Sequence, residues 1–478
     1  MNLARRVFSN FVLQIIGRIL ALILGLFIIG LMMRYLGPEN YGYYSISIAF
    51  LQVFGIIADF GLYLITLRYL GAIDNLTAEK REQKISYVMG NIFTLRLFSA
   101  LIFYGGAFAL SFLFNYPLIV QLGVGILSGS LFFCTLIQTL SAFYQKMLVT
   151  KNIFFGEVLG KMATLILMSY FVYQNFGFYA ILSVFVVGHF LNFLILFLRA
   201  QKWIFLKLRF DFNFWQRIIK DSWPIGLAII LNVLYFKADT LILSFYHSPQ
   251  EVGYYGGTYR ILEVLITIPP LFLGLIIPRL TQAWQKQDFN QLKNLFQKSF
   301  DFLVMLAWPM VLGTIILGQR IMVLVGGVEF IRAGDILKIV IISCGILFVA
   351  ELFKQTAVSL GQQRKILPFY FLTAVFSLIG YFLFIPTYSY WGAAGVTIFS
   401  EALMFVFAFY LFYQATKIIP QLYFFFKSLA ASLIMVLFLS FLIDWPLFIL
   451  VPGGALVYFI FLYFFKGFDK KMIKSLLK

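Results

Sequence analysis

The chain has 478 residues, of which 62% are hydrophobic and only 12% are charged, and its formal net charge is +18. Soluble domains carry about 45–50% apolar and about 25% charged residues, so this composition excludes a soluble enzyme and a disordered chain. Two cysteines, Cys134 and Cys344, are too few for the disulfide framework of a small secreted protein. The apolar stretches run to about 20 residues without alternation, which favours membrane-spanning helices over a β-barrel.

Breaks at proline, glycine, asparagine and charge clusters divide the chain into 14 expected spans. No small-residue cleavage site follows the first apolar run, so we expect it to remain as an uncleaved span. The sequence therefore predicts an all-α polytopic membrane protein. In chain order, the expected spans cover residues 8–33, 42–70, 88–114, 118–144, 153–173, 178–198, 222–246, 252–281, 299–318, 336–360, 367–385, 392–416, 428–443 and 447–465.

Lysine and arginine predict the orientation of these spans. With the N-terminus inside, the inner links and termini hold 25 basic residues, whereas the outer links hold three, Arg34, Arg320 and Arg332. Basic residues in short loops mark the cytoplasmic side. We therefore expect a protein of the cytoplasmic membrane with both termini in the cytoplasm, and the basic charge indicates no nucleic-acid partner.

An internal repeat appears when the chain is shifted by 211 residues. Residues 38–53 and 249–264 then share six of 16 positions, including Pro38 with Pro249 and Gly42 with Gly253. The offset spans six expected helices, and an even number keeps both copies in the same orientation. The interpretation is a parallel duplication, with substrate expected near the interface of the repeats.

The duplication predicts the domain organisation. Two six-helix bundles, residues 1–198 and 222–416, are joined by a basic cytoplasmic linker, residues 199–221. Residues 417–478 add two helices and a basic cytoplasmic tail.

Charges within the spans are the candidate functional residues, because a charge at mid-bilayer costs roughly 2.5–3.5 kcal/mol. Arg18 and Arg96 have no acidic residue nearby in their own spans, so both are expected to line a cavity. Pairs spaced by three or four residues are interpreted as local ion pairs. These are Glu157 with Lys161 and Glu351 with Lys354.

The densest charge cluster lies in the second half, with Lys237 and Asp239 on one span and Arg260 and Glu263 on the next. Pairing across these two helices is expected, and the open alternative is that the pairs break and reform during transport. Two further arginines, Arg68 and Arg279, end their spans at the inner surface. They are interpreted either as membrane anchors or as phosphate contacts.

The N-terminal part resembles a known family, the Wzx-like polysaccharide flippases of the multidrug/oligosaccharidyl-lipid/polysaccharide exporter superfamily. The resemblance rests on the run Arg-Tyr-Leu-Gly-Pro-Glu-Asn-Tyr-Gly from Arg34 to Gly42, on Asp59-Phe60-Gly61-Leu62 and on Arg68. It is specific over about residues 1–72. Elsewhere only the number of spans and the two halves agree with the family.

The resemblance implies a transporter that moves a lipid-linked oligosaccharide on a polyprenyl diphosphate to the outer leaflet, without enzymatic activity. Arginine offers paired donors that suit the diphosphate, and no cofactor or metal is expected. The expected cationic cavity comprises Arg18, Arg96, Arg260, Lys237, Arg68 and Arg279. The expected coupling or gating residues, whose ion is left open between H⁺ and Na⁺, are Asp59, Asp239, Glu263 and Glu401.

Two alternatives remain open at this point. A cation-coupled multidrug exporter of the same superfamily would share the two-bundle plan but favour acidic sites for cationic drugs. A membrane glycan polymerase or ligase would carry its reactive residues on a sizeable outer loop, whereas the longest outer link here is about 17 residues, 319–335.

Overall fold

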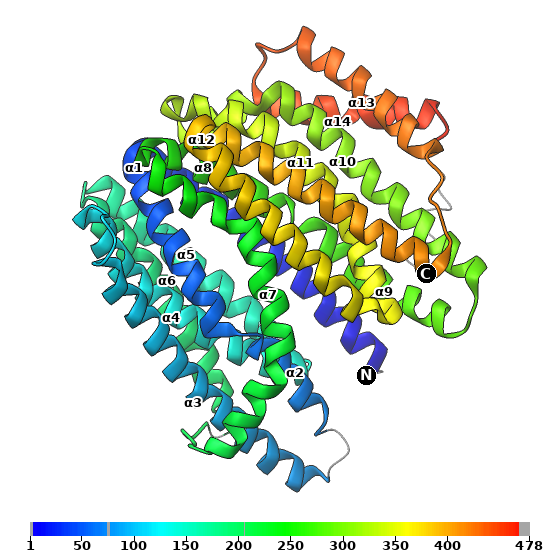
Figure 1. The fold of residues 1–478 in the computed structure, drawn as a ribbon. Coiled ribbons are helices and arrows are strands. Elements are labelled where there is room, and N and C mark those ends of the chain that lie inside the picture. The colour runs from blue at the N-terminus through cyan, green and yellow to red at the C-terminus, as the bar shows by residue number, and fades with distance from the viewer. Residues whose placement is uncertain (1–2, 74–76, 205, 468–478) are drawn as a thin grey trace. The chain divides into compact units, whose positions relative to one another are not determined.

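The computed structural model describes residues 3–73, 77–204 and 206–467. In these ranges the chain is helical and contains no strand (Figure 1). Ten helical stretches of the described chain are long and apolar enough to cross a membrane. The predicted all-helical membrane protein is therefore confirmed, and each predicted span coincides with helix over most of its length.

The helices follow one another with short connections. The first seven are α1 (Leu3–Asp59), α2 (Leu62–Gly71), α3 (Ala78–Ser111), α4 (Leu118–Lys146), α5 (Lys151–Tyr173), α6 (Phe178–Ala200) and α7 (Phe212–Tyr246). The remaining ones are α8 (Pro249–Leu265), α9 (Ile268–Gln285), α10 (Phe289–Gly326), η1 (Val328–Phe330), α11 (Ile331–Ala357), η2 (Val358–Gln362), α12 (Gln363–Thr416), α13 (Tyr423–Phe441) and α14 (Leu447–Phe464).

Some helices hold two predicted spans. The helix α1 turns sharply at Gly37, whose φ of 67° lies in the left-handed region that glycine adopts without a steric penalty. A second sharp turn occurs inside α12 at Ser389, with φ 52°. Such turns join consecutive spans without a loop, so helices and spans do not correspond one to one. The count of 14 spans and their arrangement in two bundles stay predictions.

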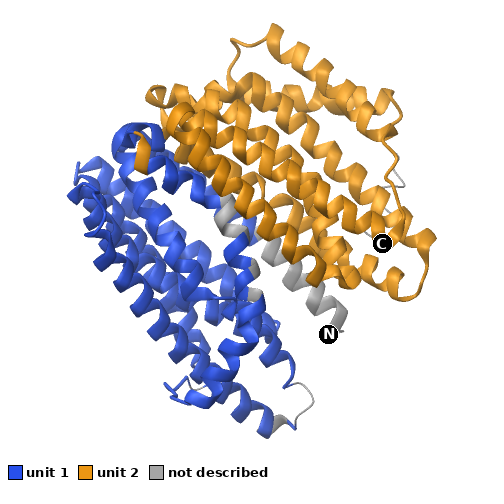
Figure 2. Ribbon diagram, in the orientation of Figure 1, with its two compact units in different colours: residues 1–244, 248–253 blue, residues 245–247, 254–478 orange. Residues whose placement is uncertain are grey.

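The chain divides into two compact units, shown in different colours in Figure 2. The first unit comprises residues 1–244 and 248–253, and in it α1 packs against α3, α4 and α5, while α6 packs against α4 and α5. The second comprises residues 245–247 and 254–478; there α10, α11 and α12 pack in sequence, and α13 and α14 pack on α10. This division places most of α7 with the first unit, and the boundaries of the duplicated bundles stay a prediction.

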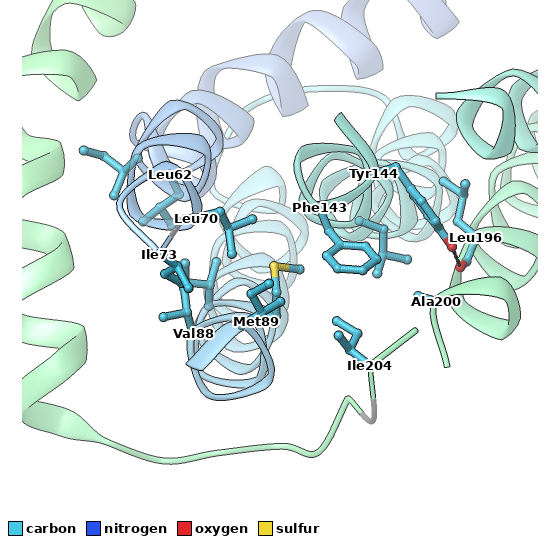
Figure 3. Close-up of a cluster of buried hydrophobic side chains, with 14 of the residues drawn as sticks. Leu62, Leu70, Ile73, Val88, Met89, Phe143, Tyr144, Leu196, Ala200 and Ile204 are labelled. Carbon is cyan, nitrogen blue, oxygen red and sulfur yellow. Dashed lines mark hydrogen bonds between the residues drawn. The ribbon is translucent and has the colours of Figure 1, made fainter. Parts of the chain in front are cut away.

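A hydrophobic cluster fixes one end of the first unit (Figure 3). It joins Leu62 and Leu70 of α2 to Met89 of α3 and Phe143 of α4. Tyr144, which belongs to this cluster, donates a hydrogen bond of 2.7 Å from its hydroxyl to the Leu196 carbonyl of α6. The short helix α2 is therefore held by its apolar side chains, although it has only ten residues.

Candidate functional site

The predicted span 42–70 is interrupted in the structure. The helix α1 ends at Asp59 and α2 begins at Leu62, and the two residues between them have positive φ angles, 41° at Phe60 and 76° at Gly61. A left-handed conformation costs roughly 1–2 kcal/mol for a residue with a side chain, but glycine adopts it freely. We call Phe60–Gly61 the first break.

A buried arginine binds the acidic residue at the first break. The guanidinium of Arg96, which is fully buried in α3, forms an ion pair with Asp59, whose side chain is 24% exposed. Nη1 of Arg96 also donates to the Thr135 carbonyl at 3.1 Å and to the Gln138 side chain at 3.2 Å. These two residues of α4 were missed by the sequence reasoning; the signal available for Gln138 was a polar side chain within an apolar span.

The equivalent span of the second copy is also interrupted. The helix α8 ends at Leu265 and α9 begins at Ile268, followed by Pro269 and Pro270. Proline lacks the N–H that would continue the hydrogen bonds of α8, but it is tolerated in the first turn of a new helix. The backbone at Thr267 stays helical, with φ −75° and ψ −19°. We call Ile266–Thr267 the second break.

The second break also carries a pair of opposite charges. Arg260 Nη1 lies 2.8 Å from Glu263 Oε2, and the two side chains are 24% and 28% exposed. Both residues belong to the last turns of α8, so this pair forms within one helix. The expected pairing across α7 and α8 stays a prediction. Interrupted helices in corresponding spans of two repeats are typical of transporter binding sites. Here the spans correspond, but the 211-residue shift places the first break on residues 271–272, five residues beyond the second break. Each unit therefore holds one candidate site: a helix break with an ion pair beside it.

Arg18 lies in a separate cluster of the first unit. Its side chain is 49% exposed and lies 3.7 Å from Glu157, which is also 3.9 Å from Lys161. Nζ of Lys161 donates to the Ala21 carbonyl at 2.7 Å. This cluster joins α1 to α5 and gives Arg18 an acidic partner that its own span does not contain.

The other candidate residues are dispersed over the helices. Asp239 is fully buried in α7 and accepts hydrogen bonds from the backbone and hydroxyl of Thr240, while Lys237 is half-buried. Glu401 is buried in α12 at 1% exposure. Arg68 is exposed in the last turn of α2, and Arg279 is half-buried in α9.

The predicted local ion pairs are present. Lys161 lies near Glu157, as described, and Lys354 lies 2.9 Å from Glu351. Within the described residues, no group of three or more His, Cys, Asp and Glu side chains is arranged to hold a metal ion.

A reciprocal contact joins the two copies of the sequence repeat. A Cβ atom added to Gly42 would collide with the carbonyl oxygen of Pro249, and one added to Gly253 would collide with that of Pro38. Both segments belong to the first unit. The repeated proline and glycine thus meet in a crossed arrangement, and the two glycines allow the backbones to touch.

The fold is shared with solved membrane transporters. A lipid II flippase, MurJ, in an inward closed conformation matches with a TM-score of 0.75 at 16% identity, covering 96% of this chain and 99% of that chain. A multidrug resistance MATE family transporter of the MOP superfamily, in an inward-facing conformation, matches with a TM-score of 0.63 at 14% identity, covering 83% and 94%. A Vibrio cholerae MATE transporter in the bent form gives 0.55 at 17% identity, covering 87% and 97%.

The comparison with curated proteins gives no match. The family model for polysaccharide biosynthesis protein matches residues 31–334, which is more than half of the chain and includes both breaks and both copies of the repeat. The chain therefore belongs to the polysaccharide biosynthesis protein family, with a fold like that of MurJ and the MATE transporters.

Proposed function

We propose that the chain is a flippase that carries a polyprenyl-diphosphate-linked oligosaccharide from the cytoplasmic to the outer leaflet by alternating access. The match to the polysaccharide biosynthesis family is the observation that supports this most. The interrupted helices, each with an ion pair beside the break, supply polar groups at membrane depth that a diphosphate needs when it loses its water.

In this proposal the arginines contact the diphosphate in different states of the transport cycle. Arg18 and Arg260 have exposed side-chain surface and present paired donors to the diphosphate. Arg96 has no exposed surface while it binds Asp59, so it contacts the diphosphate only in a state in which that pair opens. Lys237, Arg68 and Arg279 complete the cationic path. Asp59, Asp239, Glu263 and Glu401 are the coupling residues, with H⁺ or Na⁺ as the ion.

The crossed contact of Gly42 and Gly253 serves as a gate on the predicted outer side. In this proposal the close packing of the two backbones seals the outer end. Gly42→Ala is expected to hold the backbones apart and to impair flipping while the protein still inserts into the membrane. Flipping at the normal rate in this variant would contradict the gate.

Flipping in cells that lack their own flippase tests the function. The triple variant Arg18→Ala, Arg96→Ala, Arg260→Ala is expected to abolish glycan export. The corresponding triple lysine variant is expected to retain part of it, because lysine keeps the positive charge but lacks the paired N–H donors of the guanidinium. Arg332→Ala, an exposed arginine of a predicted outer link, is the matched control. Membrane insertion is measured in parallel. Full export by the triple alanine variant would contradict the cationic cavity.

A cation-coupled multidrug exporter is the second candidate. The MATE-like fold and the buried acids Asp239 and Glu401 favour it. Efflux of a cationic dye from cells that express the chain separates the two functions. The flippase proposal expects glycan export without dye efflux, and the reverse result would replace it.

A further inference from the structure

The linker between α6 and α7 lies against α3 through specific hydrogen bonds. The Arg209 backbone N–H donates to Thr94 Oγ1 at 3.0 Å, and the Asp211 N–H donates to Asn91 Oδ1 at 3.0 Å. The Trp215 indole N–H donates to the Asn91 carbonyl at 3.2 Å. Thr94 and Asn91 are fully buried, so the linker satisfies polar groups of α3 and is bound along that helix.

Tyr87 reinforces this attachment. Its hydroxyl donates a hydrogen bond to Asp211, and its ring centroid lies 5.7 Å from the Arg209 guanidinium. A Cβ atom on Gly90 would come within 2.5 Å of the Lys207 carbonyl, so the two backbones are in close contact. The hydrogen bond from Tyr87, together with backbone N–H groups at the start of α7, lowers the pKa of Asp211. The carboxylate is therefore ionised at neutral pH.

The large apolar side chains of the attached linker stay largely exposed. Phe210 also contacts Phe98 of α3, with 5.8 Å between the ring centroids. Leu208, Phe210 and Phe212 are exposed by 55%, 57% and 71%. Ile219 and Trp223, four residues apart on the first turns of α7, continue this row with 47% and 56% exposure. We call these five residues the apolar row.

Basic side chains border the apolar row. The exposed cations are Lys202, Lys207, Arg209, Arg217 and Lys220. The two acidic residues of the segment, Asp211 and Asp221, accept hydrogen bonds from the hydroxyls of Tyr87 and Tyr69, the latter at 2.7 Å. Cations outnumber acids here, so the segment presents a net positive surface together with its large apolar side chains.

This combination fits the surface of an anionic membrane. Apolar side chains bordered by lysine and arginine bind at the headgroup boundary, where the cytoplasmic leaflet attracts basic residues. The charge distribution of the chain predicts that this linker lies on the cytoplasmic side. We propose that residues 202–204 and 206–223 form a binding surface for anionic phospholipids. The apolar row enters the headgroup region of the cytoplasmic leaflet, and the five cations bind lipid phosphates.

Lipid titration of the full-length protein tests the charge requirement. The purified chain is titrated with phosphatidylglycerol and with phosphatidylcholine, and bound lipid is counted by native mass spectrometry. The linker variant is Lys202→Gln, Lys207→Gln, Lys220→Gln, which spares the contacts of Arg209. Because each surface cation contributes a factor of about five, the variant is expected to bind phosphatidylglycerol at least about tenfold more weakly and phosphatidylcholine unchanged.

The matched control removes three exposed lysines elsewhere on the predicted cytoplasmic side, by Lys286→Gln, Lys293→Gln and Lys365→Gln. It is expected to retain most of the phosphatidylglycerol affinity. An equal loss in both variants would show general charge attraction and overturn the proposal. Unchanged phosphatidylglycerol binding by the linker variant would also overturn the proposal, and would indicate that this surface binds a partner of another class.

Insertion of the apolar row is tested separately. A chain with Cys134→Ala and Cys344→Ala receives Phe212→Cys and an environment-sensitive dye, and Gln285→Cys provides a comparison site that is exposed at the end of α9. In phosphatidylglycerol vesicles, brominated lipid is expected to quench the dye at 212 more strongly than the dye at 285. Equal quenching at both positions contradicts insertion.

Discussion

The two breaks interrupt corresponding spans by different means. At the first break two successive residues adopt left-handed backbone angles, and the charge beside it is neutralised from another helix, by Arg96. At the second break the backbone of Thr267 stays helical, two prolines prevent the hydrogen bonds from continuing, and the charges pair within α8. The first break thus depends on a tertiary contact with another helix. The second break depends on residues of its own segment, the two prolines and the i,i+3 ion pair.

This difference has an energetic consequence. A cross-helix pair with a fully buried arginine is strongly coupled to the packing around it, because losing one partner leaves an uncompensated charge. A pair three residues apart on one helix contributes only a few tenths of a kcal/mol. We therefore expect substitutions at the first break to lower the free energy of unfolding more than substitutions at the second break.

The largest expected effect comes from removing Arg96. Arg96→Ala is expected to lower the free energy of unfolding by about 3 kcal/mol, because Asp59 loses its partner in a largely buried position. Arg260→Ala is expected to lower it by less than about 0.5 kcal/mol. Unfolding of both variants in the same detergent provides the measurement.

The double variant Asp59→Asn, Arg96→Met serves as the control for this comparison, since it removes both charges together. It is expected to recover much of the stability that Arg96→Ala loses. If Arg96→Ala and Arg260→Ala are equally stable, the two breaks do not differ in the way described.

A smaller effect is expected from Gly61→Ala. The new side chain must adopt φ near 76°, which costs roughly 1–2 kcal/mol. Gly71→Ala is a suitable control, because a Cβ atom there meets nothing within 4 Å. Thermal unfolding of the two variants is compared, and an unchanged midpoint for Gly61→Ala would show that the first break tolerates other backbone angles.

A small effect on stability is also expected from replacing the prolines of the second break. Replacing the two prolines, by Pro269→Ala and Pro270→Ala, is expected to change the free energy of unfolding by less than about 1 kcal/mol, because α8 and α9 then continue into one helix. Transport is expected to slow if the break moves during the cycle. Unfolding and glycan flipping are measured on the same variant, and a stability loss as large as that of Arg96→Ala contradicts the comparison.

The sequence predicted much of this fold because membrane insertion is governed by local composition. Apolar stretches gave the positions of the helices, and Pro269 and Pro270 offered a readable signal for the second break. The first break had a weaker signal, since Gly61 alone within an apolar span does not distinguish a break from close packing. The roles of the candidate residues in transport stay predictions.

The sequence by itself determined that the chain is a helical membrane protein, which stretches are helical and which local ion pairs form, because these properties depend on residues within one turn or one span. Only the tertiary structure decided that Arg96 binds Asp59, that Arg18 meets Glu157, and that Gly42 and Gly253 cross against Pro249 and Pro38. These partners lie tens to hundreds of residues apart in the chain. A buried charge requires a partner, but its identity depends on which helices pack together.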